Sequence, residues 1–477
     1  MATTVNLRKI LDRKQWEFCS PAPTATAAGT FITSSRLYRQ KQFYLVNAST
    51  AWVYLPEEDG WSELPSPGLG GTFAAGACGV CSPIGSTGTA VAGSTSAIQT
   101  NLSLARDLRG YKIRITAGSS AGDERTIAYN TIGTSATIYP TVPFTSAINN
   151  TSQYQLITTR WYVWNAHTAS QVANQFKYYD YALNTWTSAA LPSIGAAWGT
   201  DGRLVATPSI VDNTNMIFSS GTSTGSNTSA TINNTGKTWT VNQWANAYQV
   251  RITAGTGAGQ IRNISSNTAT ALTVSVAWGT IPDATSVYVI EGCDDYLYLM
   301  GNNAVTMYRY QISTNTWTTL SPGVARGAAP AAGLSGHWIW GNTDSTWRNE
   351  SSILNGRRIY SFRAGGGAVL DYYDIPSNAW TNTITWSPNT TVFGAGTKYS
   401  IISGRYIWIQ KDATNRWYRF DTAKNELDPG GQFLYPQGAA VTGDTCFDVS
   451  YTDGATSLTW IYMVLNTSQV MLRMLLI

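Results

Sequence analysis

A short unit that pairs an aromatic residue with a tryptophan recurs along this chain and constrains its fold more than any other feature. In the stretch of residues 372–380, Tyr373 is followed five positions later by Asn378 and seven positions later by Trp380. The same spacing recurs as Tyr54 with Asp59 and Trp61, Tyr179 with Asn184 and Trp186, Tyr310 with Asn315 and Trp317, and Phe420 with Asn425 and Leu427. Copies this regular indicate a repeat architecture.

Each copy has the composition of a β-hairpin corner. An aromatic-rich run ends one strand, and Asp, Asn, Ser and Pro then form the turn, because short polar side chains bond the local backbone and tolerate left-handed dihedral angles. The tryptophan begins the next strand and packs back across the turn. Hairpins repeated at a period near that of one four-stranded sheet predict a β-propeller.

The two ends of the chain each contain part of a further repeat. Residues 16–21, Trp-Glu-Phe-Cys-Ser-Pro, align with residues 317–322, Trp-Thr-Thr-Leu-Ser-Pro, but no aromatic strand precedes them. Residues 457–477 have the pattern of two apolar strands with no tryptophan strand after them. The N-terminal strand is therefore predicted to close the last blade, which removes exposed sheet edges. Tryptophan-type positions at 16, 61, 186, 317, 380 and 427 predict six blades.

Two intervals between repeats are too long for a blade, and both contain copies of one element. Residues 111–125 match residues 248–262 without a gap. Each copy follows a tract rich in Gly, Ser, Thr and Ala, residues 85–100 and 219–236, which indicates a flexible linker. Exposed loops tolerate such insertions. The expected organisation is a propeller of residues 1–86, 160–220 and 291–477, with small inserted β-domains at residues 87–159 and 221–290.

Composition and charge argue against several classes of protein. Lys plus Arg is 31 and Asp plus Glu is 27, and the net charge of +4 is too small to indicate nucleic acid or an acidic membrane as a partner. Charged residues make up 12% of the chain whereas Trp (19) and Tyr (26) are abundant, which predicts a rigid all-β protein. No run of 18 apolar residues and no apolar signal-peptide core are present, so neither a membrane span nor secretion is expected.

Residues that could carry catalysis or hold a metal are few and scattered. The 2 histidines, His167 and His337, have no nucleophile motif nearby, so neither a serine triad nor a copper site is expected. Cys78 and Cys81 form a single CxxC, which fits two small residues of a packed inner strand better than a zinc site. The acidic clusters at residues 57–59 and 294–295 fit solvated turns, although paired carboxylates for glycan cleavage stay an alternative. We predict no enzyme activity, no cofactor and no metal.

The duplicated element supplies the candidate binding residues. Its glycine-rich run, residues 255–259 in the second copy, lies between two strand patterns, which predicts a β-turn and not a nucleotide loop. Arginines flank this turn in both copies, Arg114 and Arg125 in the first, Arg251 and Arg262 in the second. We predict that these arginines contact a partner. Arginines on an ordinary surface strand are the alternative.

The unit of Tyr-Asp, polar turn and tryptophan resembles the kelch repeat and covers nearly all of the chain outside the insertions. The inserted motif Arg-Ile-Thr-Ala-Gly-x-x-Ala-Gly-x-x-Arg, residues 114–125 and 251–262, resembles elements of structural proteins of tailed bacteriophages. The resemblance implies a non-enzymatic structural or attachment component of the virion (neck, collar, tail or capsid-associated), made in the host cytoplasm. Its partners would be other virion proteins and copies of itself. A carbohydrate-binding, lectin-like propeller that recognises host-surface glycan, and a glycan-cleaving enzyme, are the alternatives.

Overall fold

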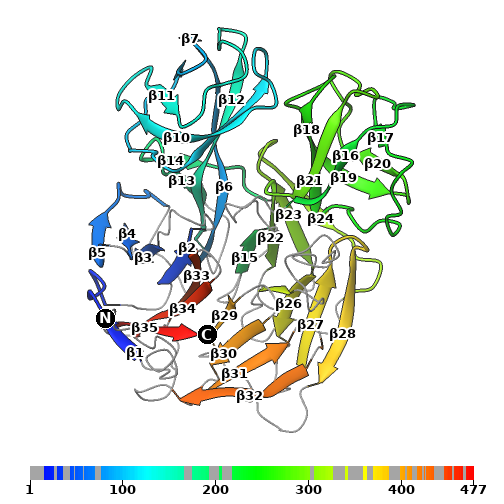
Figure 1. The fold of residues 1–477 in the computed structure, drawn as a ribbon. Helices are drawn as coiled ribbons and strands as arrows, with labels where there is room; N and C mark the ends of the chain where they lie inside the picture. Colours follow the sequence, from blue (N-terminus) through cyan, green and yellow to red (C-terminus); the bar gives the residue numbers. More distant parts are fainter. Residues whose placement is uncertain are drawn as a thin grey trace, which may run out of the picture.

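The structure is a computed structural model, and its described strands run from β1 near the N-terminus to β35 near the C-terminus (Figure 1). It describes residues 16–25, 30–35, 43–47, 49–56, 58–69, 77–165, 175–192, 203–206, 217–300, 306–325, 339–341, 358–362, 369–385, 398–402, 406–410, 416–421, 424, 426–434, 445–453, 456–465 and 469–476. Every regular element in these ranges is a β-strand, which confirms the all-β prediction. Within them no helix is long and apolar enough to cross a membrane.

Each predicted hairpin corner is present as a pair of antiparallel strands. The aromatic residue lies directly opposite the tryptophan, as in the Tyr310–Trp317 and Tyr373–Trp380 pairs. The strands are β4 (Thr50–Leu55) with β5 (Gly60–Glu63), β13 (Phe176–Asp180) with β14 (Thr185–Ser188), β23 (Met307–Gln311) with β24 (Thr316–Leu320), β27 (Val369–Asp374) with β28 (Ala379–Thr385), and β31 (Arg416–Asp421) with β32 (Glu426–Leu434).

In the four units whose polar residue the structure describes, this residue has the role in the turn that its chemistry predicts. Asn315 has a φ of 52°, in the left-handed region that Asn tolerates better than most residues. Its side-chain oxygen accepts a hydrogen bond of 2.7 Å from the Tyr310 hydroxyl, so one residue both forms the turn and ties it to the preceding strand. The same bond joins Tyr179 to Asn184, Tyr373 to Asn378 and Tyr54 to Asp59, with oxygen–oxygen distances between 2.5 and 2.7 Å.

Six antiparallel sets of four strands follow one another along the chain. Five of them are separate four-stranded sheets, and the sixth, β6-β12-β13-β14, is part of a nine-stranded sheet. Each set contains one hairpin corner or its terminal counterpart. Their remaining strands are β2 (Phe31–Ser34) and β3 (Phe43–Asn47); β6 (Cys78–Thr89) and β12 (Gln153–Trp164); β15 (Arg203–Ala206) and β22 (Tyr296–Met300); β25 (Ile339–Gly341) and β26 (Arg358–Phe362); β29 (Lys398–Ile402) and β30 (Tyr406–Gln410); and β33 (Thr445–Asp453), β34 (Thr456–Val464) and β35 (Met471–Leu476) with β1 (Trp16–Cys19).

The strand β1 joins the two ends of the chain. It pairs antiparallel with β35 from Trp16 opposite Met474 to Cys19 opposite Met471, and so completes the set that begins with β33. An ion pair of 2.9 Å between Arg473 and Glu17 crosses the same two strands. The N-terminal strand therefore lies where the sequence alignment of Trp16 predicts it.

A hydrogen bond from a tryptophan joins successive sets at three places. The indole N–H donates to the backbone carbonyl that follows the tryptophan strand of the preceding set: Trp61 to Ser20 (3.4 Å), Trp186 to Pro65 (2.7 Å) and Trp317 to Ala190 (2.7 Å). Each acceptor lies four residues beyond the tryptophan of its own set. At the next position Asn378 donates to the carbonyl of Ser321, which has the same spacing from Trp317. The first strands also lie side by side, β2 beside both β33 and β6, β6 beside β15, and β29 beside both β25 and β33.

The two duplicated segments each lie between the first and second strand of a set, and we refer to residues 87–159 as the first insert and residues 221–290 as the second insert. They project beside one another from the other sheets (Figure 1). The first contains β7 (Ala92–Gly93), β8 (Ile98–Gln99), β9 (Lys112–Ala117), β10 (Glu124–Asn130) and β11 (Thr137–Pro140). The second insert contains β17 (Thr231–Asn233), β18 (Tyr248–Ala254), β19 (Ile261–Asn267) and β20 (Ala271–Val274). The strands β16 (Ile217–Thr222) and β21 (Val287–Gly292) begin and end it.

The small-residue tracts before the inserts are not flexible linkers, and this corrects the sequence-based prediction. Residues 85–100 contain the end of β6 with β7 and β8, and residues 219–236 contain most of β16 and all of β17. Glycine is required there by close packing rather than for flexibility, since a Cβ on Gly88 would lie 2.1 Å from the Asn101 side chain and 2.4 Å from the Tyr154 hydroxyl. The first insert is thus continuous with the nine-stranded sheet that contains β6 and β12, whereas the strands of the second form a six-stranded sheet of their own.

Candidate functional site

The turns of the two inserts pack directly against each other. A Cβ on Gly122 would lie 2.5 Å from the carbonyl oxygen of Thr253, and a Cβ on Gly259 would lie 2.6 Å from that of Thr116. Gly122 and Gly259 are equivalent in the duplicated motif, and so are Thr116 and Thr253. The glycine of each insert therefore contacts the threonine of the other insert. This reciprocal pattern is typical of an interface with two-fold symmetry. Both glycines have φ near +90°, at +95° and +89°.

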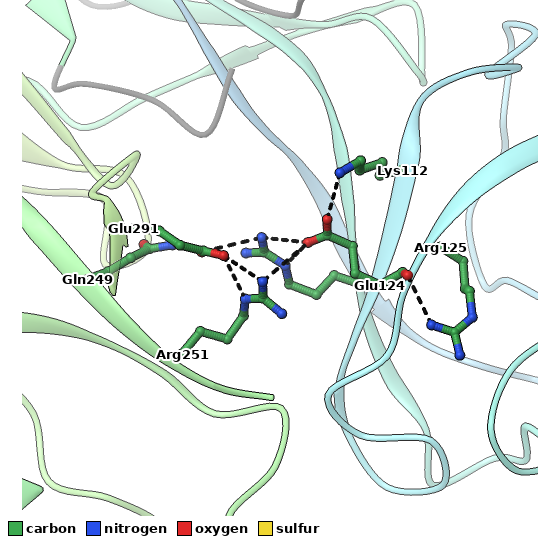
Figure 2. A network of polar contacts seen from close by, with 7 residues as sticks. Lys112, Glu124, Arg125, Gln249, Arg251 and Glu291 are labelled. Carbon is green, nitrogen blue, oxygen red and sulfur yellow. Dashed lines mark hydrogen bonds and ion pairs between the residues drawn. The ribbon is translucent and has the colours of Figure 1, made fainter. Parts of the chain in front are cut away.

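A buried cluster of charges lies at this contact, built from both inserts (Figure 2). Within the first insert Arg114 pairs with Glu124 at 2.7 Å. Between the second insert and the strand that ends it, Arg251 pairs with Glu291 at 2.5 Å. Two longer contacts cross from one to the other, Arg114 to Glu291 at 3.6 Å and Arg251 to Glu124 at 3.9 Å. The four side chains are 12% exposed or less.

Strand register explains how the cluster forms. Glu124 on β10 lies directly opposite Arg114 on β9, so the two side chains lie on the same face of the sheet. In the second insert the position opposite Arg251 is Ile261, and the acid comes instead from β21, where Glu291 is paired with Gln249. Both copies have the arginine, but its acidic partner lies on β10 in the first copy and on β21 in the second.

Burial and charge act against each other on the two acids. Burial disfavours the ionised form of Glu124, but Arg114, Arg251 and Lys112 outweigh it and lower its pKa below the usual range. Burial opposes ionisation of Glu291 as well, and Arg114 and Arg251 again lower its pKa. Both acids are therefore ionised at neutral pH. Removing one member of such a cluster leaves an unpaired buried charge, which costs far more than an exposed ion pair contributes.

The other two predicted arginines brace loops of their own inserts. The Nε of Arg125 donates to the carbonyl of Pro143 at 2.9 Å, and the Nε of Arg262 donates to that of Ala277 at 3.0 Å. Arg125 also pairs with Asp123 at 3.0 Å, whereas Arg262 lies over the Trp278 ring at 5.5 Å. All four arginines thus make contacts inside the chain, and Arg114 and Arg251 are brought together. Their contact with an external partner stays a prediction.

Sequence reasoning missed Glu124, Glu291 and Lys112. The signal for Glu291 was present, because a single acid follows the apolar run Val287–Ile290 in a chain that has only 27 acidic residues. A charge beside such a run is expected to be paired, since lone buried charges are rare. The identity of the partner was not in the sequence, because it depends on how two distant strands come together.

Most of the large apolar side chains that are exposed in the described part of the chain lie on the inserts. Val142 and Val276 occupy equivalent places in the two copies and are 59% and 58% exposed. Seven of the nine such residues belong to the inserts, Val91, Tyr129, Ile132, Val142, Val241, Val276 and Ile281, and the other two are Phe18 and Val324. Scattered apolar residues are ordinary on a protein surface, but these are concentrated on the projecting part of the chain.

The other candidate residues of the sequence have structural roles wherever the structure describes them. Cys78 and Cys81 are buried residues of β6, as expected for a packed strand. Residues 255–259 connect β18 and β19, as the predicted β-turn does. Asp295 accepts hydrogen bonds from Asn263 and Gln311. His167, His337 and Glu57 lie outside the described residues. Within those residues no group of three or more His, Cys, Asp or Glu side chains could hold a metal ion.

Comparison with known proteins adds little to this picture. No protein-family model matches the chain, and no curated protein matches it. Among solved structures, one match is described as the structure of U3-55K, with 8% identity, 36% of this chain and 45% of that chain covered, and a TM-score of 0.23. The match spans less than half of that chain, and a likeness this small carries no argument.

Proposed function

We propose that this chain is a non-enzymatic structural or attachment component of a tailed-bacteriophage particle, which binds other virion proteins and copies of itself. The observation that carries the proposal is the pairing of the two inserts through the buried charge cluster. Because of this pairing, two separate insertions form one projecting unit, the paired inserts, instead of two independent arms. A rigid projecting unit with exposed apolar side chains is suited to bind another protein.

We further propose that the four-stranded sets form a six-bladed, kelch-like propeller closed by the N-terminal strand. Six sets of four antiparallel strands support this arrangement, as does the pairing of β1 with β35. The tryptophan hydrogen bonds between successive sets and the contacts among the first strands are the contacts that blades of a ring would make. Such a ring would serve as the rigid base from which the paired inserts project.

Pre-organisation is the physical advantage of the paired inserts. A binding surface whose parts are already fixed loses less conformational entropy on association than one made of mobile arms. The pairing also places Val142 and Val276 at symmetry-related positions, so that the unit offers two equivalent apolar contacts. Apolar side chains at the centre of an interface are removed from water when it forms, while the polar side chains around them stay at its solvated rim.

The test is a surface substitution that leaves the fold intact. Val142→Lys combined with Val276→Lys places a charge at both exposed positions, and the expected result is loss of incorporation into phage particles and of any self-association seen by sedimentation velocity. The matched control is Val324→Lys, which changes an exposed valine outside the inserts (51% exposed). Normal incorporation of the double variant, with an unchanged melting temperature, would contradict the proposal that the paired inserts provide the contacts.

A further inference from the structure

Two junctions between successive sets hold one backbone residue at both of its polar groups. At the first of them, Trp317 donates to the carbonyl of Ala190 at 2.7 Å, and the Ala190 N–H donates to the side-chain oxygen of Asn315 at 2.8 Å. At the second, the carbonyl of Ser20 also accepts from a tryptophan, and the Ser20 N–H donates to Asp59 at 2.9 Å. The polar residue of the hairpin corner therefore accepts a backbone N–H of the preceding set at both junctions.

The junction between the set of β4 and β5 and the set of β13 and β14 differs in one respect. The equivalent backbone residue is Pro65, which has no N–H to donate. Its carbonyl still accepts from the Trp186 indole at 2.7 Å. The side-chain oxygen of Asn184 instead accepts from Nη2 of Arg106 at 2.9 Å. Arg106 belongs to the first insert, so the insert occupies the acceptor that binds the preceding set at the other two junctions.

Arg106 is held at this corner by further contacts. Its Nη2 also lies 3.3 Å from the Tyr179 hydroxyl, and its guanidinium lies 5.6 Å from the centroid of the Tyr181 ring. Beside it, the N–H of Ala105 donates to the carbonyl of Ala182 at 2.9 Å. The side chain of Arg106 is half-buried. Partial burial strengthens its charge-assisted hydrogen bonds, because less water competes for the same groups.

The second insert contacts the corner of its own set in another way. Its Asn263 side chain donates to Asp295 at 2.9 Å, and the oxygen of Asn315 accepts from Ala190 of the preceding set. The first insert, by contrast, supplies the hydrogen bond that elsewhere comes from the preceding set. The exchange coincides with the one junction of the three at which proline removes the backbone donor.

We infer that Arg106 couples the position of the first insert to the junction at Pro65. When the insert shifts, Asn184 loses the donor that replaces the missing N–H, and the corner that carries Trp186 loses its support. The Trp186–Pro65 hydrogen bond then opens more often. A partner that moves the first insert would loosen this junction, and loosening the junction would release the insert, because such coupling is reciprocal. The effect of a partner rests on the proposed function, whereas the coupling itself does not.

The test is hydrogen exchange followed by NMR on the full chain, isotopically labelled at tryptophan and alanine. The indole N–H of Trp186 reports the junction, the backbone N–H of Ala105 reports the contact of the insert, and the indole N–H of Trp317 is the internal reference. Arg106→Met removes the charge-assisted hydrogen bond. Exchange at Trp186 and Ala105 should become roughly tenfold faster, and exchange at Trp317 should not change.

Adding Pro65→Ala to Arg106→Met supplies the missing backbone N–H and separates the two ends of the coupling. Exchange at Trp186 should return to within about twofold of the parent, because Asn184 regains a donor. Exchange at Ala105 should stay fast, because the insert still lacks its arginine. Unchanged exchange at Trp186 in Arg106→Met would overturn the coupling. Failure of Pro65→Ala to restore it would overturn the assignment of Arg106 to the missing bond.

Two further variants keep the result specific. Arg109→Met removes an arginine of the same segment whose side chain is 71% exposed, and should change neither probe. If it speeds exchange at Trp186 as much as Arg106→Met does, the effect is a general loosening of the insert and the inference is wrong. If Arg106→Met does not fold, Arg106→Lys, which lacks the planar guanidinium, takes its place, and restoration by Pro65→Ala is required there too. All these measurements use the isolated chain, so a negative result leaves the proposed docking role of the inserts untouched.

Discussion

Arg114 of the first insert lies 3.6 Å from Glu291 of the strand that ends the second, although 177 positions separate them in the chain. Neither residue is more than 1% exposed. This contact and its counterpart between Arg251 and Glu124 make the two inserts a single unit, because a buried charge from each side is neutralised partly by the other. The orientation of the inserts therefore depends on a small number of ionised groups.

The first prediction concerns Glu291. Glu291→Gln keeps the shape of the side chain and removes the charge that neutralises Arg251, so it should lower the free energy of unfolding by about 3–5 kcal/mol. Chemical denaturation followed by circular dichroism measures the change. The control is Glu426→Gln, whose partner Lys424 is exposed, and this substitution should cost less than about 1 kcal/mol. Equal effects of the two substitutions would show that the cluster does not stabilise the fold.

The second prediction is the response to acid. Glu124 and Glu291 have lowered pKa values in the folded chain, where burial is outweighed by Arg114 and Arg251. The unfolded chain therefore binds more protons at acidic pH than the folded chain does. The stability that the two acids contribute is fully present above the unfolded pKa of about 4.3 and is lost as the pH falls below it. The melting temperature of the parent should therefore fall steeply below about pH 5.

A variant with Glu124→Gln and Glu291→Gln provides the comparison for this acid response. It should start from a lower melting temperature at pH 7 and show a shallower fall below pH 5, because two of the responsible groups no longer titrate. Identical slopes in the parent and the double variant would assign the acid response to other carboxylates.

The hairpin corners could be predicted from the sequence because all the residues that form one lie close together in it. Tyr310, Asn315 and Trp317 interact within one turn, so spacing alone indicated their geometry, and their strand register confirms it. The charge cluster could not be predicted in this way. Arg114 is local to Glu124, but its contact with Glu291 depends on the docking of two inserts, which no local pattern encodes. The prediction that the small-residue tracts are flexible linkers was wrong for a related reason. Close packing and flexibility both require glycine, and only the neighbouring side chains distinguish them.

The third prediction separates the two roles of Asn315. Asn315→Ala removes the side-chain oxygen that accepts from the Tyr310 hydroxyl. It also puts alanine at a φ of 52°, which alanine tolerates less well than asparagine, so the free energy of unfolding should fall by about 2–3 kcal/mol. Asn315→Gly loses the same acceptor but adopts this backbone angle freely, so it should cost about 1 kcal/mol. Thermal denaturation of the two variants gives the difference. If both cost the same, the left-handed conformation contributes nothing to the cost.

The fourth prediction concerns closure by β1. Deletion of residues 1–22 removes the strand that pairs with β35 and the Ser20 carbonyl that accepts from Trp61. It leaves the backbone of Met471–Met474 as an unpaired edge, which favours aggregation. We expect protein that is insoluble or rapidly cleaved by protease. Deletion of residues 1–12 keeps β1 and is the control. A soluble monomer with an unchanged melting temperature after the longer deletion would show that β1 is dispensable.

The last prediction compares the tryptophans of the repeated unit, which the sequence predicts to be largely buried. Trp380 is 2% exposed, whereas Trp186 and Trp317 are half-buried. Trp380 packs in an apolar cluster with Tyr373 and Ile375, so Trp380→Ala leaves a cavity and should cost about 3–5 kcal/mol.

Trp186→Ala removes less buried surface and the indole hydrogen bond to Pro65, and should cost about 2 kcal/mol. Trp186→Phe keeps part of the packing but not the hydrogen bond, so its cost relative to Trp186→Ala measures the packing alone. Urea denaturation of the three variants tests the order Trp380→Ala, Trp186→Ala, Trp186→Phe, from the most to the least destabilised. If Trp186→Ala is as costly as Trp380→Ala, the contact between successive sets through Pro65 contributes more to stability than burial within a set.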